Sequence, residues 1–240
     1  MDDRANCMGR REMINRLCGI LLSLLAWHRL PLKPQNGNLQ SLITYPIQVV
    51  AIGSGACNIL DHIIETGIQG FKMVFICSDA RYVQPSQADL RIQIGRGLRA
   101  EFGCHGDPDL GRRAALEQAP RIKDALRSSR TNVIIACLGG GTGTGAGPLV
   151  AEWSMASGAE TFAVVTMPFD FEGKRRYEQA LNGLREFQRR VKLLHIHYNE
   201  VASEYRHSPL TEVYDINDEV IVASCKTLIL SAKQSCELSS

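Results

Sequence analysis

The chain has 240 residues, of which 45% are hydrophobic, and its formal net charge at pH 7 is +2. This length suits one large α/β domain or two small ones, and the near-neutral charge argues against a nucleic-acid-binding face. Eight cysteines without a CxxC pair, two of them inside apolar strand patterns, favour reduced, buried thiols in a cytosolic protein over a disulfide framework.

Residues 1–44 differ in character from the rest of the chain. Four arginines precede an apolar run, residues 17–27, that is too short to span a bilayer. No small-residue cleavage site of a secretory signal follows it. Two interpretations stay open: a basic, apolar helix in contact with a membrane interface, and a poorly ordered extension. We therefore predict an N-terminal extension over 1–44, a domain over 45–230 and a short tail over 231–240.

From residue 47 onward, apolar strand patterns alternate with helical patterns. The first strand, 47–52, runs into a glycine-containing loop, 53–58, and a helix follows over 59–66. Further strands are expected over 73–78, 90–94, 133–138, 161–167 and 193–197. Further helices are expected over 107–126, with Pro120 as a kink, over 172–191 and over 211–230.

Strands joined by helices predict an α/β fold with a mostly parallel, Rossmann-like sheet covered by helices on both faces. Ligands of such sheets bind at the carboxyl ends of the strands. The loop after residue 52, the turn Ser78-Asp79 and the glycine-rich stretch after residue 138 all fall at that edge. We expect one ligand site there.

The most informative stretch is GGGTGTGAGP, residues 139–148, between an apolar strand and an apolar helix in which Pro148 suits the first turn. Glycines let backbone N–H groups approach an anion, and a helix N-terminus adds partial positive charge. No Lys-Ser or Lys-Thr follows, so the stretch is not a Walker loop. It predicts phosphate binding.

A dinucleotide fingerprint is the rival interpretation. Gly53-x-Gly55 follows the first strand and Asp79 follows the second, but Asn58 stands where the third glycine would fall. A second glycine-rich loop favours a triphosphate held from both sides over NAD(P). An NAD(P)-dependent Rossmann enzyme remains the alternative.

GGGTGTGAGP resembles the motif of the tubulin and FtsZ family. Four further segments are similar to FtsZ: VVAIGSGACN at 49–58, CSDA at 77–80, GCHGDP at 103–108 and PFDFEGKRR at 168–176. The resemblance covers residues 47–230. It implies a GTP-binding domain of a self-assembling cell division protein, cytoplasmic or at the division site. Its partner would be itself or a full-length FtsZ-like protein in a longitudinal contact.

The resemblance also implies the site residues for GTP or GDP, with Mg²⁺ as the accompanying ion. The phosphates would be held by Ser54, Gly55, Ala56, Cys57, Asn58, Gly103, Gly106, Gly140, Gly141, Thr142, Gly143, Thr144 and Gly145. The ribose and guanine would be approached by Glu172, Arg176, Asn199, Tyr214 and Asp218. A carboxylate that accepts two donors selects guanine, and Tyr214 lies one helical turn before Asp218. Cβ atoms at Ser54, Ala56 and Cys57, where the family has glycine, are expected to crowd the phosphates.

In FtsZ the long helix leads to an acidic loop that completes the GTPase site of the next subunit, and then to a second domain. Here Glu237 is the only carboxylate after Leu230. We therefore expect GTP binding with hydrolysis slowed by about 10²–10⁴ unless a partner supplies the acidic loop. Six apolar residues of the helix are expected to lack part of their usual cover: Val220, Ile221, Val222, Leu228, Ile229 and Leu230. An inactive fragment is a further alternative. His195-x-His197 lacks the partner spacing of a metal site.

Overall fold

The computed structural model describes residues 45–98, 100, 102–191, 193–198 and 210–237. All of them belong to one compact unit, Leu39–Ser240. The extension predicted over residues 1–44 lies outside the described residues, and so does Asn199. None of the helices within the described ranges is long and apolar enough to cross a membrane.

Six strands form one sheet in the order β3-β2-β1-β4-β5-β6, and every neighbouring pair is parallel. The strands are β1 (Tyr45–Ile52), β2 (Lys72–Cys77), β3 (Leu90–Gln93), β4 (Ser129–Cys137), β5 (Glu160–Met167) and β6 (Leu193–Tyr198). In register, Val49 of β1 pairs with Met73 of β2 and with Val133 of β4. The chain order reverses between β1 and β4, which is the switch point at which ligands bind in doubly wound sheets.

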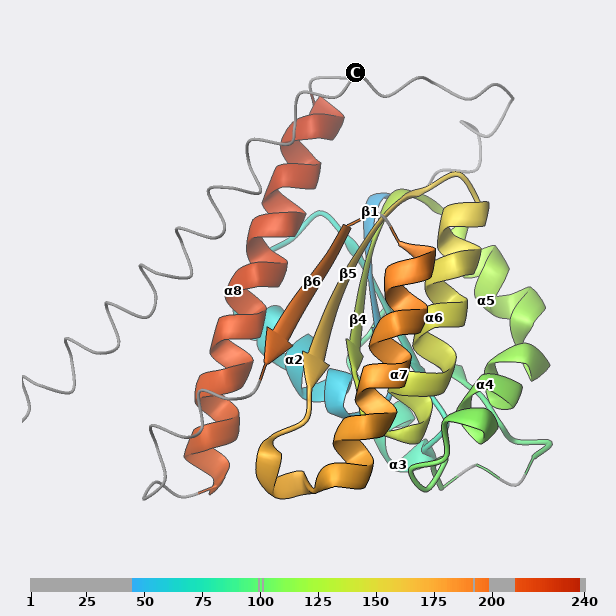
Figure 1. Cartoon of the computed structure of the whole chain (residues 1–240). Coiled ribbons are helices and arrows are strands. Elements are labelled where there is room, and N and C mark those ends of the chain that lie inside the picture. The colour runs from blue at the N-terminus through green and yellow to red at the C-terminus, as the bar shows by residue number, and fades with distance from the viewer. Residues whose placement is uncertain (1–44, 99, 101, 192, 199–209, 238–240) are drawn as a thin grey trace, which may run out of the picture. The chain divides into compact units, whose positions relative to one another are not determined.

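Helices cover both faces of the sheet (Figure 1). They are α2 (Ser54–Glu65), α3 (Ala80–Val83), α4 (Pro108–Glu117), α5 (Ala119–Leu126), α6 (Gly141–Ala156), α7 (Lys174–Arg190) and α8 (Leu210–Glu237), with a 3₁₀ turn η2 (Asp170–Glu172). Alternate strand residues separate the two cores. Val50 and Ile52 pack with residues of α4 to α7, whereas Val49 and Ala51 pack with residues of α2 and α8. The predicted α/β, Rossmann-like fold is confirmed.

Three helix boundaries differ from the expectation. Helix α2 begins at Ser54, inside the predicted loop, and α6 begins at Gly141, so that Pro148 lies in the helix interior and not in its first turn. The helix predicted over 107–126 is two helices that meet at Gln118. Pro120 lies in the first turn of α5, where its missing N–H costs no hydrogen bond.

Helix α8 is better covered than expected and extends into the predicted tail as far as Glu237. Ile221, Val222 and Ile229 are buried against the sheet and α2, and Leu230 is a large apolar residue of this stretch that is exposed, at 50%. The expected loss of cover is therefore wrong for Ile221, Val222 and Ile229, which complete the core on the α2 face, whereas Val220 and Leu228 are half-buried.

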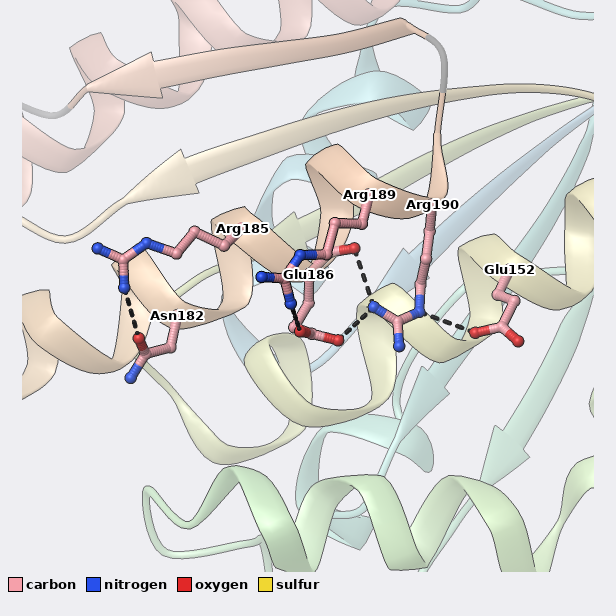
Figure 2. A network of polar contacts seen from close by, with 6 residues as sticks. All are labelled: Glu152, Asn182, Arg185, Glu186, Arg189 and Arg190. Atoms are coloured by element: carbon pink, nitrogen blue, oxygen red, sulfur yellow. Dashed lines mark hydrogen bonds and ion pairs between the residues drawn. The ribbon is translucent and has the colours of Figure 1, made fainter.

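A polar network fixes the end of α7 to α6 (Figure 2). The Arg190 guanidinium donates to a Glu152 carboxylate oxygen at 2.8 Å and also binds Glu186, which in turn accepts from Arg189 at 2.9 Å. Arg185 donates to Asn182 at 3.0 Å along the same helix. The network holds α7 beside the glycine-rich helix α6. It thereby fixes the position of the α7 residues that reach the carboxyl edge of the sheet.

Candidate functional site

A cavity of about 510 Å³ opens at the carboxyl ends of the central strands. Its walls come from segments far apart in the sequence: 52–55, 77–79, 102–106, 137, 139–143, 172, 175, 176 and 179. The first five groups lie at or after the carboxyl ends of β1, β2, β3 and β4, and the last residues belong to η2 and α7. The cavity therefore lies at the predicted edge, across the switch point of the sheet.

Two helix N-termini face this cavity without a side-chain cap. Gly53 precedes α2 and Gly140 precedes α6, and neither makes a side-chain capping hydrogen bond. A Cβ atom at Gly53 would lie 3.1 Å from the Gly143 nitrogen, so the two N-termini lie side by side. Their free N–H groups and helix dipoles together form a site for a polyanion.

Close packing explains several glycines of the 139–147 stretch. A Cβ atom at Gly143 would lie 2.2 Å from the Cys137 carbonyl oxygen, and one at Gly145 would lie 1.9 Å from the Pro108 carbonyl oxygen. Helix α6 can approach β4 and α4 only because these positions lack side chains. Gly140 is different, because a Cβ atom there would meet nothing within 4 Å. That space is part of the cavity.

A hydrogen-bond chain joins three of the segments at the cavity floor. Ser78 Oγ lies 2.8 Å from Thr142 Oγ1, and the Cys104 thiol donates to Ser78 Oγ at 3.3 Å. Burial raises the pKa of Cys77 to about 12 and that of Cys137 to about 11. Both cysteines therefore line the cavity as neutral thiols, which do not repel an anion.

The two carboxylates of the cavity wall already have partners. Asp79 caps α3 and binds the Arg81 guanidinium at 2.7 Å, and the hydrogen bond from Arg81 is the main cause that lowers the Asp79 pKa. Glu172 accepts from the Phe169 N–H at 2.9 Å and pairs with Arg176 Nε at 3.0 Å. Both groups shape the wall while their charge is compensated.

An aromatic cluster with an acidic neighbour lies at the β5 end of the cavity. Phe169 stacks on Phe171 with ring centroids 5.0 Å apart and meets Tyr214 edge-on at 5.2 Å. The charges of Glu172, Arg176 and Asp218 all act on the Tyr214 hydroxyl, so the structure brings these four residues together. Burial is the main cause that raises the Asp218 pKa to about 6. A carboxylate poorly solvated by water is prepared to accept ligand donors.

Of the predicted site residues, those that line the cavity are Ser54, Gly55, Gly103, Gly106, Gly140, Gly141, Thr142, Gly143, Glu172 and Arg176. Those described outside its lining are Ala56, Cys57, Asn58, Thr144, Gly145, Tyr214 and Asp218. Asn199 lies outside the described residues.

Helix geometry places several of these residues away from the cavity. Ala56 and Cys57 turn into the core beside α8. The expectation that their Cβ atoms crowd the phosphates is therefore wrong. Asn58 is exposed. Thr144 Oγ1 accepts from the Gly139 N–H at 2.8 Å, which closes the turn before α6.

Twelve further residues of the wall were not among the predicted site residues: Ile52, Gly53, Cys77, Ser78, Asp79, Phe102, Cys104, His105, Cys137, Gly139, Arg175 and Gln179. Ser78 and Asp79 directly follow β2, and the sequence placed their turn at the ligand edge without assigning either residue to the site. Gln179 donates to the Gly106 carbonyl oxygen at 2.8 Å, a contact that only the packing of α7 reveals.

A doubly wound parallel sheet with two uncapped helix N-termini at its switch point defines a Rossmann-like, nucleotide-binding class of protein. The family model described as "Tubulin/FtsZ family, GTPase domain" matches residues 46–205. The chain belongs to the Tubulin/FtsZ family, which confirms the resemblance found in its sequence.

Named relatives agree with this assignment. The chain is 37% identical over 207 residues to "Cell division protein FtsZ 1" of Methanocaldococcus jannaschii, covering 85% of this chain and 57% of that protein. A solved empty FtsZ dimer of M. jannaschii superposes with a TM-score of 0.73 at 37% identity, over 79% of this chain and 56% of that one. The chain thus spans less than two thirds of these relatives.

A more distant neighbour shows the same fold. CetZ2 from Haloferax volcanii, solved as a GTPγS-bound protofilament, superposes with a TM-score of 0.67 at 21% identity. The match covers 78% of this chain and 58% of that one.

Proposed function

We propose that the cavity binds GTP and GDP and that the chain takes part in FtsZ-like filament assembly in cell division. One observation carries the proposal: the uncapped N-termini of α2 and α6 meet in one cavity, with Gly53 and Gly143 in near contact. Two adjacent anion sites suit a chain of phosphates better than a single phosphate. The family membership supports guanine as the base.

Guanine is selected by Asp218 in this proposal. An ionised carboxylate accepts the N1–H and the amino group of guanine, whereas adenine offers no such donor pair. Asp218 is half-buried and near Tyr214, which exposes 38% of its surface and can pack on a base. Ligand binding would then extend the cavity toward α8.

Hydrolysis is completed by another subunit in this proposal. Asp79 and Glu172, the carboxylates of the cavity wall, are held by Arg81 and Arg176. Neither is free to activate a water molecule. The described residues contain no cluster of three or more His, Cys, Asp or Glu that could hold a metal ion. Mg²⁺ would therefore be held mainly by the phosphates and by water.

A partner would dock over the cavity mouth. Phe102, in the cavity wall, and Phe171, beside Glu172, expose 62% and 57% of their surfaces. Large exposed aromatic side chains around a site are typical of docking surfaces. We expect GTP-dependent sedimentation of assemblies to fall in Phe102→Ser and Phe171→Ser. Leu116→Ser, which removes an apolar side chain that is 49% exposed on α4, is the matched control.

Competition among GTP, ATP and NAD for the chain tests the nucleotide. GTP should win, whereas preference for NAD would support the dinucleotide alternative and overturn the proposal. Gly140→Leu should abolish binding while the domain stays folded, because its side chain enters open cavity space. Gly97→Ala, near the flexible end of Glu117, is the control that should bind normally.

Phosphate release tests the partner requirement. The chain alone should turn GTP over slowly, and a full-length FtsZ-like protein should accelerate release. Brisk turnover by the chain alone would contradict the idea that a second subunit completes the site.

A further inference from the structure

A buried hydrogen bond joins the edge strand β6 to helix α8, which lies beside it (Figure 1). His197 Nε2 lies 3.0 Å from Ser224 Oγ, and the two residues are only 7% and 4% exposed. The Ser224 hydroxyl donates to the Val220 carbonyl oxygen at 3.2 Å within α8, so its oxygen is left to accept from the His197 Nε2–H. Neither residue lines the cavity, so the contact does not hold a ligand directly.

The sheet fixes His197, whereas apolar packing alone does not fix α8 as closely. Strand β6 pairs with β5 in register, with His197 opposite Thr166, and the ring of His195 lies 4.6 Å from that of His197. Helix α8 packs on this face of the sheet through buried apolar side chains such as Ile221 and Ile229. Apolar burial is non-directional and permits small rotations of a helix, but a hydrogen bond has a preferred distance and angle.

Rotation of α8 would move the residue proposed to select guanine. Asp218 lies less than two turns before Ser224 on the same helix, about 9 Å along its axis. Its charge acts on the thiol of Cys137, which lines the cavity. Because side chains extend about 5–6 Å from a helix axis, a rotation of about 20° displaces one by about 2 Å, which is enough to break a hydrogen bond.

We propose that His197 and Ser224 are positioning residues that set the rotation of α8 and thereby make the cavity select guanine. Their hydrogen bond holds the Asp218 carboxylate where it accepts both the N1–H and the amino group of guanine. The phosphates bind at the N-termini of α2 and α6, which this contact does not touch. This inference rests on the proposed nucleotide function of the cavity.

Affinities of GTP, ITP and inorganic tripolyphosphate test the inference. ITP lacks the amino group of guanine, and tripolyphosphate lacks the whole nucleoside. The wild type should bind GTP about tenfold more tightly than ITP, because ITP cannot form one hydrogen bond to the carboxylate. Ser224→Ala should lose most of this preference, while its affinity for tripolyphosphate stays unchanged. A contact that only stabilised the fold would change the three affinities alike.

Three further variants separate positioning from stability. The double variant His197→Leu with Ser224→Ala leaves neither partner unpaired, so it should be more stable than Ser224→Ala and still lack the preference for GTP. His197→Gln keeps an N–H donor and should keep the preference. Thr227→Val removes a hydroxyl that donates to the Ala223 carbonyl oxygen within α8, at 3.0 Å. It is the matched control and should bind all three ligands as the wild type does.

A double variant that still prefers GTP over ITP would overturn the inference, and so would equal losses of all three affinities. A wild type that binds tripolyphosphate but does not distinguish GTP from ITP would instead refute the base site proposed at Asp218. A wild type that binds none of the three ligands would refute the proposed nucleotide function. Either wild-type result would also remove the inference that rests on it.

Discussion

The side-chain oxygens of Ser78 and Thr142 lie 2.8 Å apart at the cavity floor, although the residues are 64 positions apart in the sequence. This contact joins the turn after β2 to the first turn of α6. Ser78→Ala would remove the hydrogen-bond partner that the Ser78 hydroxyl provides to the buried Thr142 hydroxyl and to the Cys104 thiol. We expect GTP affinity to fall by about 1 kcal/mol, and stability by about 1–2 kcal/mol, in titrations and urea unfolding.

Ser86→Ala is the matched comparison for that variant. Ser86 is also buried, and its hydroxyl accepts one hydrogen bond, from the Ala88 N–H at 3.3 Å, outside the cavity wall. The Ser86→Ala protein should be less stable than the wild type but should bind GTP with the same affinity. A Ser78→Ala protein with wild-type affinity would show that the contact does not position the phosphate loop.

Replacement of different glycines in the 139–147 stretch should change the stability of the domain by different amounts. Gly143→Ala places a methyl group 2.2 Å from the Cys137 carbonyl oxygen, and we expect a loss of about 3 kcal/mol or more of unfolding free energy. Gly140→Ala meets nothing within 4 Å and should change stability by less than about 1 kcal/mol. Chemical denaturation checks both variants, and equal stabilities would contradict the packing account.

Guanine nucleotide affinity should depend on the ionisation of Asp218. Its pKa in the folded chain is raised from 3.8 to about 6, mainly by burial. Only the carboxylate accepts the two guanine donors, so affinity should fall as the pH drops below about 6. Nucleotide phosphates titrate in the same range, so the informative comparison is with Asp218→Asn, which should bind weakly at every pH. Asp124→Asn, on α5, should follow the wild type.

The same raised pKa has a consequence for stability. Protonated Asp218 favours the folded state, and this contribution is fully present below pH 3.8 and is lost as the pH rises through about 6. Because the residue is only half-buried, solvent screening reduces the effect. We expect Asp218→Asn to raise the unfolding free energy at pH 7 by about 1 kcal/mol. A less stable variant would contradict this assignment.

His197 should have the opposite pH dependence. Burial is the main cause that lowers its pKa from 6.5 to about 4, and its Nε2 lies 3.0 Å from Ser224 Oγ. The neutral imidazole is favoured by folding, so its contribution is fully present above pH 6.5 and is lost as the pH falls toward 4. The expected loss is up to about 3 kcal/mol.

Urea unfolding of the wild type and His197→Gln between pH 4 and 7 measures this contribution. The difference between the two proteins should shrink as the pH falls. Parallel profiles would show that His197 does not carry the effect. His195, whose pKa burial also lowers, should be replaced in a separate variant, because the two rings lie 4.6 Å apart.

Apolar patterns in the sequence were sufficient to predict the sheet. Runs such as residues 133–138 have no polar alternation because both faces of the strand are covered, and this feature predicts parallel pairing. The beginning of α6 was not predictable in the same way. Glycine disfavours helices, yet Gly141 to Gly147 are helical because tertiary packing against Cys137 and Pro108 outweighs propensity.

The candidate site was predictable where it follows strand ends and glycine motifs. Ser54, Gly140 and Thr142 line the cavity for that reason. Ala56 and Cys57 do not, because a helix that starts at Ser54 turns them into the core. Gln179 reaches the wall only through the position of α7, which no local pattern encodes.

The cavity walls are drawn from chain segments that lie between residues 52 and 179 and meet only in the finished sheet. An unfolded chain therefore offers no nucleotide site, and ligand binding selects the folded population by mass action. A nucleotide present at 100 times its dissociation constant would add about 2.7 kcal/mol to the free energy of unfolding. A supply of nucleotide would then lengthen the time for which each copy survives proteolysis.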